Sequence, residues 1–391
     1  MGLSRRVGRV ASLVLVLAAH AERARADEIT SPPETQPGAR MESDAGAAFE
    51  RAVASKCAAG EATLTNMARQ ILTGRGTESR TTDTEAIAFA QRATGEPHPW
   101  PKVWVASART LAPLSTLEKV DAWLRELGPS PLRRCAAAAG RTPDGGEAVV
   151  VVAVDALADL APLPRRARTG QWLSVAAHLR VHAKGGKVIV LGPSGVPQPL
   201  PTSFDGKTVR AWFAPDGPGE FAVQVVADLA SGPRPVLETP VFADVEPPVL
   251  ASPCAAPGED EPQDGQDEPI AIARMLASAR TWAGLPPFER DGRLDAVARE
   301  HAVRIARVQR LAHDAGDGDP VERLRAAGLE TQEVGENLAT APTAVLAHRA
   351  TWASPSHRVN ILRRDFERVG LAVAHDSRGD AWVVEIFTSA L

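Results

Sequence analysis

The segment between residues 246 and 269 constrains the fold most, because it interrupts the hydrophobic patterns on both sides of it. It contains six prolines and an acidic cluster, which are Pro247, Pro248, Pro253, Pro257, Pro262 and Pro269 with Glu259, Asp260, Glu261, Asp264, Asp267 and Glu268. This composition predicts an extended, solvated linker over 247–268, without the regular alternation of a calcium-binding loop. A 391-residue chain also exceeds what one hydrophobic core usually organises, so we expect separate domains.

The first 26 residues have the arrangement of an export signal. Three arginines precede an apolar run from Val10 to Ala19, and a small-x-small cleavage site ends at Ala26. The apolar run is too short to cross a hydrocarbon core about 30 Å thick. We therefore predict a signal peptide over 1–26, cleaved after Ala26, followed by a flexible tether over 27–45. The mature protein is expected to be secreted or periplasmic, with no transmembrane span.

Charge and cysteine content narrow the range of partners. The net charge of -4 provides no positive field for phosphates, so we do not expect nucleic-acid binding. Cys57, Cys135 and Cys254 fit no metal-binding spacing. Cys57 and Cys135 fall in one predicted domain and can pair in an oxidising compartment, which would leave Cys254 as a free or intermolecular thiol. Spacing alone does not decide this pairing.

Residues 46–155 show helical patterning that ends in one strand signal. Ser115 and Glu118 resemble a capping box ahead of an apolar stripe, and Gly128-Pro129 stops that helix. The apolar run from Ala148 to Val154 predicts a buried strand. These patterns predict a mainly helical N-terminal domain.

Residues 156–246 change to the period of strands. Strand segments are expected near 171–183, 186–191, 207–214, 219–230 and 234–244, separated by glycine-rich turns. Their spacing predicts an antiparallel, immunoglobulin-like β-sandwich. His178 and His182 lack an acidic companion, which favours a spacer or adhesion role over an enzymatic one.

The C-terminal region, 269–391, alternates helices and strands. Helices are predicted up to Gly284, from Arg293, from Asp319 to Gly328 and over 344–353, and a hairpin is predicted from Val369–His375 and Ala381–Thr388. The third of these helices has Pro320 at its first position, and Glu322 completes its cap. This order of elements is typical of a mixed α/β domain.

Five motifs follow one another in this region, and together they resemble one family. They are Gly284-Leu285-Pro286, His313, Gly335-Glu336-Asn337, Trp352-x-Ser354-Pro355-x-His357-Arg358-x-Asn360-Ile361-Leu362 and Gly370. This order is similar to that of bacterial domains of the CAP superfamily (cysteine-rich secretory protein, antigen 5 and pathogenesis-related 1), also called SCP domains. The resemblance covers about 270–391 and implies an α/β/α sandwich.

The resemblance also implies a ligand-binding cleft. The matching positions are His313, Glu336 and His357, which in the family line a cleft that can hold a divalent cation. Two imidazoles and one carboxylate suit Zn²⁺, with one coordination position left for water or a ligand. We expect all three at helix ends or turns. The supporting residues are Asn337, Ser354, Arg358 and Asn360.

Each predicted site residue also has a structural alternative. Glu336 could chiefly accept hydrogen bonds from backbone amides, His313 could cap carbonyls, and His357 could bond to Glu336. Among the other histidines, His301 is expected in the core with its polar atoms satisfied. His348 and His375 are expected at the surface.

Three functions are compatible with these patterns. The first is a secreted CAP protein that binds a cation, or a lipid, glycan or protein ligand of the cell envelope. The second is a secreted, metal-dependent hydrolase of peptidase type in which Glu336 acts as a base. The third is an adhesion or scaffold protein without catalysis. Ser354 stands where many eukaryotic relatives have a second glutamate, so the four-residue cluster of that family is incomplete.

The N-terminal domain also shows a faint echo of the C-terminal one. Trp123, the Ser130-to-Arg134 run and the strand from Val149 follow the same order as Trp352, Ser354-to-Arg364 and the final strand. Residues 46–155 are therefore either a degenerate CAP-like domain or a plain helical domain.

Overall fold

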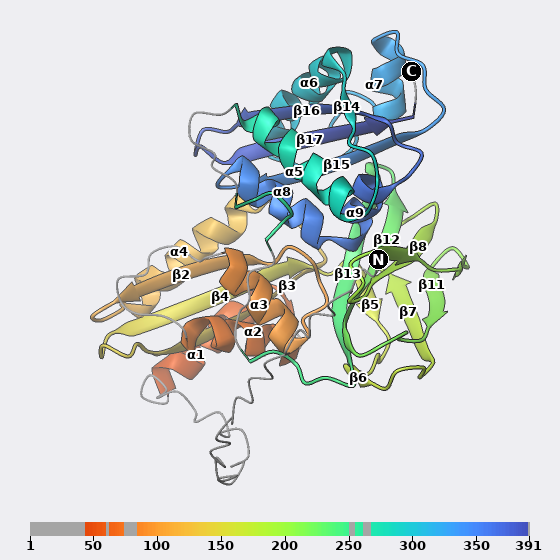
Figure 1. Ribbon diagram of the computed structural model, residues 1–391. Helices are drawn as coiled ribbons and strands as arrows, with labels where there is room; N and C mark the ends of the chain where they lie inside the picture. Colours follow the sequence, from red (N-terminus) through yellow and green to blue (C-terminus); the bar gives the residue numbers. More distant parts are fainter. Residues whose placement is uncertain (1–43, 60–61, 74–83, 250–254, 261–266, 390–391) are drawn as a thin grey trace, which may run out of the picture. The chain divides into compact units, whose positions relative to one another are not determined.

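A computed structural model describes residues 44–59, 62–73, 84–249, 255–260 and 267–389 (Figure 1). The predicted signal peptide, nearly all of the predicted tether and Cys254 lie outside the described residues. Within the described residues, no helix has the length and apolar character needed to cross a membrane.

The N-terminal region is a sheet covered by helices on both faces. Its elements are α1 (Asp44–Ala54), β1 (Ala58–Ala59), α2 (Ala62–Thr73), α3 (Thr84–Thr94), β2 (Lys102–Ala108), α4 (Pro113–Glu126), β3 (Arg133–Arg141) and β4 (Glu147–Asp155). The strand order is β1-β3-β4-β2. Successive residues of β4 alternate between the two faces: Val150 and Val152 join the cluster under α2 and α3, and Val149 and Val151 join the other.

The N-terminal domain was expected to be mainly helical, and the structure adds a four-stranded sheet between its helices. Strand β4 was predicted, but β2 and β3 were not. The centre of β3 is a run of four alanines, 136–139, and three of them are buried. A strand covered on both faces has no polar alternation to identify it. Helix α4 also begins earlier than expected, because Pro113 occupies its first turn and Ser115 lies inside it.

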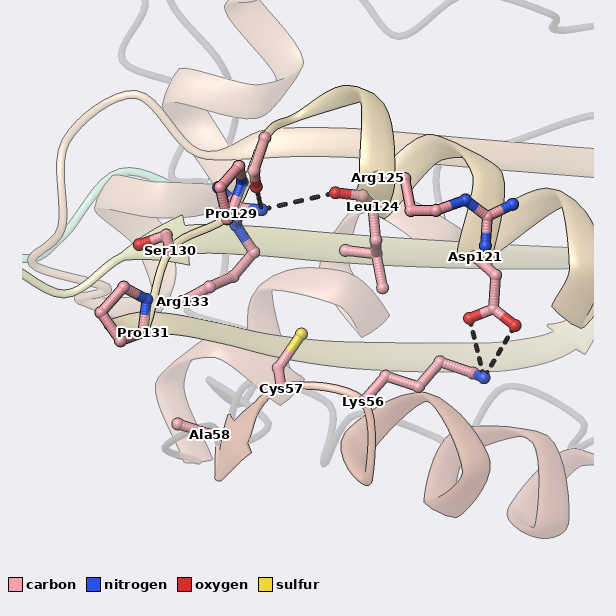
Figure 2. Close-up of a pocket in the computed structure, with 11 residues that line it drawn as sticks. Lys56, Cys57, Ala58, Asp121, Leu124, Arg125, Pro129, Ser130, Pro131 and Arg133 are labelled. Atoms are coloured by element: carbon pink, nitrogen blue, oxygen red, sulfur yellow. Dashed lines mark hydrogen bonds and ion pairs between the residues drawn. The ribbon is translucent and has the colours of Figure 1, made fainter.

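The Cys57–Cys135 disulfide links the end of α1 to β3, with the two Cα atoms 5.7 Å apart. A cavity of about 570 Å³ lies beside the disulfide, and Figure 2 shows Cys57 among the residues that line it. Two of the cations that line this cavity have partners. Lys56 pairs with Asp121 at 2.7 Å, and Arg133 donates to the carbonyl of Gly128 at 2.6 Å, just past the end of α4.

Residues 158–243 form two sheets that share one apolar core. The strands are β5 (Ala158–Leu160), β6 (Arg166–Ala167), β7 (Leu173–Leu179), β8 (Gly186–Leu191), β9 (Pro197–Pro199), β10 (Thr202–Phe204), β11 (Thr208–Phe213), β12 (Gly219–Leu229) and β13 (Gly232–Ala243). One sheet has the order β10-β11-β7-β5 and the other β6-β13-β12-β8-β9. The five predicted segments match β7, β8, β11, β12 and β13. Strands β5, β6, β9 and β10 span only two or three residues each and were missed.

The C-terminal region has a sheet between two helical layers, as Figure 1 shows for α6 and α8. Its elements are α5 (Glu268–Trp282), β14 (Glu289–Arg290), α6 (Gly292–Val308), α7 (Pro320–Ala326), β15 (Val334–Ala341), α8 (Ala344–Ala353), α9 (Pro355–Leu362), β16 (Arg368–His375) and β17 (Ala381–Thr388). The strand order is β14-β16-β17-β15, with a separate apolar cluster on each face. The predicted helices and hairpin are confirmed, including the capping box of Asp319 and Glu322 on α7.

The N-terminal and C-terminal sheets have the same connectivity. In each, a two-residue strand pairs in parallel with the next-to-last strand, which pairs antiparallel with the last. The last strand then pairs antiparallel with the second strand of the domain. The two sheets therefore have equivalent strand orders and equivalent strand pairings.

The segment predicted as a solvated linker is partly packed. Among its described residues, 255–260, Ala256 is buried in the cluster under α5 and α8. Glu259 forms an ion pair with Arg349 of α8 and accepts a hydrogen bond from the backbone of Ala256. The acidic cluster was interpreted as wholly solvated because sequence alone does not show that Arg349 supplies a buried partner.

Candidate functional site

The Gly335-Glu336-Asn337 motif lies in the strand β15, where we had expected a turn. Side chains alternate across a strand, so consecutive Glu336 and Asn337 point to opposite faces of the sheet. Glu336 shares the face of Leu338, which belongs to the cluster under α6. Asn337 shares the face of Ala339, which belongs to the cluster under α8. One motif thus contributes to two polar clusters.

Glu336 is the centre of the first cluster. One carboxylate oxygen accepts from Nδ1 of His313 at 2.8 Å, and the other forms an ion pair with Arg323 of α7. Arg323 also donates to the carbonyl of His313 at 2.6 Å and to that of Gly318 at 2.5 Å. Arg323 therefore fixes both the carboxylate and the loop that carries His313.

Neighbouring charges keep Glu336 ionised although its side chain is buried. Burial alone would raise its pKa, but the hydrogen bond and charge of His313, with the charges of Arg323 and His301, outweigh it and lower the pKa. An ionised carboxylate only accepts hydrogen bonds, so Nδ1 of His313 carries the proton that is shared with Glu336.

His301 supports this cluster from α6. It is fully buried, as predicted, and both of its ring nitrogens face acceptors: Asp317 at 2.7 Å and the carbonyl of Ala312 at 3.2 Å. The 309–319 loop is thereby attached to α6 on either side of His313. His301 is a satisfied core histidine, as expected.

The second cluster was largely missed from the sequence. Glu385 of β17 is completely buried and accepts from His348 at 2.7 Å and from the amide of Asn337 at 2.9 Å. His348 was expected at the surface but is also completely buried. A glutamate inside the apolar strand from Ala381 to Thr388 was the available signal, because a buried carboxylate needs a polar partner.

His357 lies in the first turn of α9, and its ring is unprotonated near neutral pH. Burial and the charge of His313 lower its pKa to about 4, against the opposing effect of Glu385. Nδ1 of His357 and Nε2 of His348 are buried without a hydrogen-bond partner among the described residues. The structure thus couples His357 electrostatically to His313, whereas His313 bonds directly to Glu336.

The predicted supporting residues connect α9 to the two clusters. Asn360 donates to the carbonyl of Glu336 at 3.3 Å and to the side chain of Asn337 at 2.9 Å. Arg358 donates to the carbonyl of Trp352 at 2.5 Å and lies 3.8 Å from the centre of its ring. Ser354 occupies the N-cap position of α9, and its hydroxyl accepts from Gln224 of β12 at 3.1 Å.

The β12–β13 hairpin contacts the loop that carries His313. The backbone N–H of Asp314 donates to the carbonyl of Ser231 at 3.2 Å. A Cβ atom on Gly232 would lie only 2.6 Å from Cβ of His313 and 2.8 Å from its Cδ2. The hairpin therefore packs directly on His313, and glycine is the residue that allows this approach.

The donor set differs from the three-ligand site that we predicted. Both oxygens of Glu336 already have partners, and in the part of the chain that the structure describes no three His, Cys, Asp or Glu side chains are arranged to hold a metal ion. The two imidazoles each keep one ring nitrogen that no described residue engages. Glu336 holds Nδ1 of His313, which leaves Nε2 as the nitrogen that would face a ligand. Nδ1 of His357 has no hydrogen bond to another described residue.

A sheet between two helical layers, with a polar cluster on its edge strand β15, defines an α/β/α domain with a His/Glu site. Residues 273–387 match the model of the cysteine-rich secretory protein family, CAP. These residues therefore form a CAP-superfamily domain, and the resemblance stated from the motifs is confirmed for this part of the chain.

Comparison with solved structures finds several chains with low similarity to this one. An outer surface protein from Borrelia burgdorferi is 20% identical, with 33% of this chain and 96% of that chain covered and a TM-score of 0.31. An extracellular protein containing an SCP domain from Bacillus anthracis is 15% identical, with coverages of 60% and 67% and a TM-score of 0.30. A cysteine-rich secretory protein from Staphylococcus aureus is 13% identical, with coverages of 59% and 88% and a TM-score of 0.28. No curated protein matches the sequence.

Proposed function

We propose that this protein is exported and that its CAP domain binds a divalent transition-metal cation through Nε2 of His313 and the ring of His357. The observation that supports this most is the hydrogen bond from Nδ1 of His313 to Glu336, because it fixes the tautomer that a metal-binding imidazole needs. Glu336 then acts by orienting His313 instead of binding the cation.

Each neighbouring residue has a defined part in this proposal. Arg323 holds the carboxylate of Glu336 in place, and burial keeps His357 unprotonated and so able to donate its lone pair. Two imidazoles favour Zn²⁺, Cu²⁺ or Ni²⁺ over Mg²⁺ or Ca²⁺. When bound, such a cation would polarise an oxygen atom of a ligand at its open positions. The ligand that we propose is a lipid, glycan or protein of the cell envelope.

The hydrolase alternative has less support. A general base should have a pKa near the working pH, whereas that of Glu336 lies below its ordinary value and both of its oxygens are engaged. Binding without turnover is therefore the better proposal. The adhesion or scaffold alternative predicts no cation binding at all, so a titration with Zn²⁺ distinguishes it from the binding proposal.

Export and domain ancestry belong to this proposal as well. The Cys57–Cys135 disulfide is typical of an oxidising compartment, which supports cleavage of a signal peptide after Ala26 and a secreted or periplasmic location. The two sheets over 158–243 support an immunoglobulin-like module. The shared strand order supports a degenerate CAP-like origin for residues 46–155.

Isothermal titration of the tag-free mature protein with Zn²⁺ tests the cation site. We expect His313→Ala and His357→Ala each to abolish binding, and Glu336→Gln to weaken it by about 10- to 100-fold because the orientation of His313 is lost. His375→Ala is the matched control, since His375 is exposed and pairs with Glu268 instead of the cleft residues. Unchanged Zn²⁺ binding in both histidine variants would refute the proposal.

A further inference from the structure

Two solvent-exposed tryptophans lie at the sheet β10-β11-β7-β5. Trp212 in β11 is 54% exposed, and Trp172, just before β7, is 74% exposed. Residues of both strands alternate strictly between core and surface, and the neighbours Leu173 and Phe213 are buried in the shared core. Trp172 and Trp212 therefore lie on the outer face of this sheet, where their side chains do not contribute to the apolar core.

The strand register places the two indoles next to each other. Trp212 is directly opposite Ser174 of β7. Trp172 lies one residue before β7 begins, and continuing the alternation of β7 by that residue puts it on the same face as Ser174. Such diagonal neighbours are about 7–8 Å apart, within reach of aromatic side chains. The next residues of β7 on this face, Ser174 and Ala176, are small and leave the rings accessible. The result is a flat aromatic platform, defined here as Trp172, Ser174 and Trp212.

The polar groups beside the platform carry little free charge. Arg210, two residues from Trp212 on the same face, pairs with Asp205 at 2.6 Å. The hydrogen bond from Arg210 lowers the pKa of Asp205 to about 2, so this pair stays ionised and mutually neutralised at neutral pH. Ser203 lies opposite Arg210 in the adjacent strand β10. Hydroxyl and paired ionic groups can bond to sugar hydroxyls, but they provide no net field for a polyanion.

The area of the platform also limits its partner. The exposed parts of two indoles amount to about 300 Å², judged from the 150–250 Å² that one aromatic side chain can bury. A stable protein interface needs about 800 Å² from each partner. The platform is thus too small to hold a second copy of the chain, and its size suits a few rings of an extended chain molecule.

We propose that this platform binds a β-1,4-linked polysaccharide of glucose or N-acetylglucosamine. In such sugars the substituents are equatorial, so each face of the ring presents C–H bonds that match the negative face of an indole. The two tryptophans would stack on separate sugar rings while Ser174, Asp205 and Arg210 bond to hydroxyl groups at the edges. This site belongs to the β-sandwich and does not depend on the cation site of the CAP domain.

Titration calorimetry of the full mature chain with cellohexaose and chitohexaose tests the proposal and distinguishes the two sugars. At least one should bind, whereas α-linked maltohexaose and heparin should not. Each indole would stack on one sugar ring, so Trp172→Ala and Trp212→Ala should each weaken binding about tenfold or more. The double variant should not bind measurably.

Two control variants show whether sugar binding depends on the platform itself. Leu114→Ala removes a side chain that is 79% exposed elsewhere and should leave sugar binding unchanged. His313→Ala should also leave it unchanged, and the tryptophan variants should still bind Zn²⁺. The proposal is overturned if neither β-linked hexasaccharide binds, if binding survives in the double variant, or if sedimentation velocity shows a dimer that the double variant abolishes.

Discussion

At the scale of single residues, the buried ion pair between Glu336 and Arg323 is the contact on which the His313–Glu336 cluster depends. Their side chains are only 1% and 6% exposed, so neither can exchange its partner for water. We expect Glu336→Gln to destabilise the protein by about 3–5 kcal/mol, because it leaves the Arg323 charge buried and uncompensated. Urea unfolding measures this loss. The control is Glu289→Gln, which changes a 69% exposed partner of Arg368 and should cost under about 1 kcal/mol.

His357 makes stability depend on pH. Its pKa falls from 6.5 to about 4 on folding, so between these values the unfolded chain binds more protons than the folded one. The stabilisation is present above pH 6.5 and is lost as the pH falls towards 4, by about 2–3 kcal/mol for a shift of this size.

Urea unfolding at pH 7, 5 and 4 in the presence of a chelator checks this expectation, with His357→Gln as the comparison. The variant should lose part of the slope over this range. His375 has a raised pKa and acts in the opposite direction, so only the difference between the two proteins reports on His357. Equal slopes would show that His357 does not titrate as the structure implies.

At the scale of elements, Gly370 sets the distance between β16 and α6. A Cβ atom there would lie 2.4 Å from the backbone carbon of Leu294, which cannot move without shifting the helix. We expect Gly370→Ala to destabilise the protein by about 1–3 kcal/mol through overpacking. Gly292→Ala, in the first turn of α6 with no described atom within 4 Å of the added Cβ, should be nearly neutral in the same unfolding experiment.

The elements that sequence predicted well are those with local signals. Helix α7 was found from Asp319, Pro320 and Glu322, whose capping interactions involve only neighbouring residues. Strand β3 was missed because its alanines are covered on both faces by helices distant in the sequence. Periodicity does not identify strands that are covered on both faces, and β4 was predicted from its continuous run of valines instead.

The candidate site shows the same division. His313, Glu336 and His357 could be named from the motif order, but the roles of Arg323, Glu385 and His348 depend on tertiary contacts. The sequence places Glu336 and Asn337 side by side, whereas the pleat of β15 separates them into two clusters. The roles of Glu336 and Asn337 therefore depend on the motif lying in a strand, whereas we had predicted a turn.

At the scale of the whole molecule, the N-terminal and C-terminal sheets share a strand order but differ in the side chains of one edge strand. Strand β2 contains Val103, Trp104 and Val105, whereas β15 contains the Gly335-Glu336-Asn337 motif. The topology of such a sheet needs only apolar side chains on both faces. A polar cluster such as that of Glu336 also needs specific paired polar groups.

The whole-molecule contact most open to test is the one between the β12–β13 hairpin and His313. Gly232 has a φ of 103°, and an added Cβ would lie 2.6 Å from Cβ of His313. We expect Gly232→Ala to displace the hairpin, and hydrogen exchange should then increase over 309–319. Gly206→Ala is the matched control, because its φ of 92° imposes similar backbone strain with no described atom within 4 Å of the added Cβ. Equal exchange over 309–319 in the two variants would mean that the hairpin does not constrain the His313 loop.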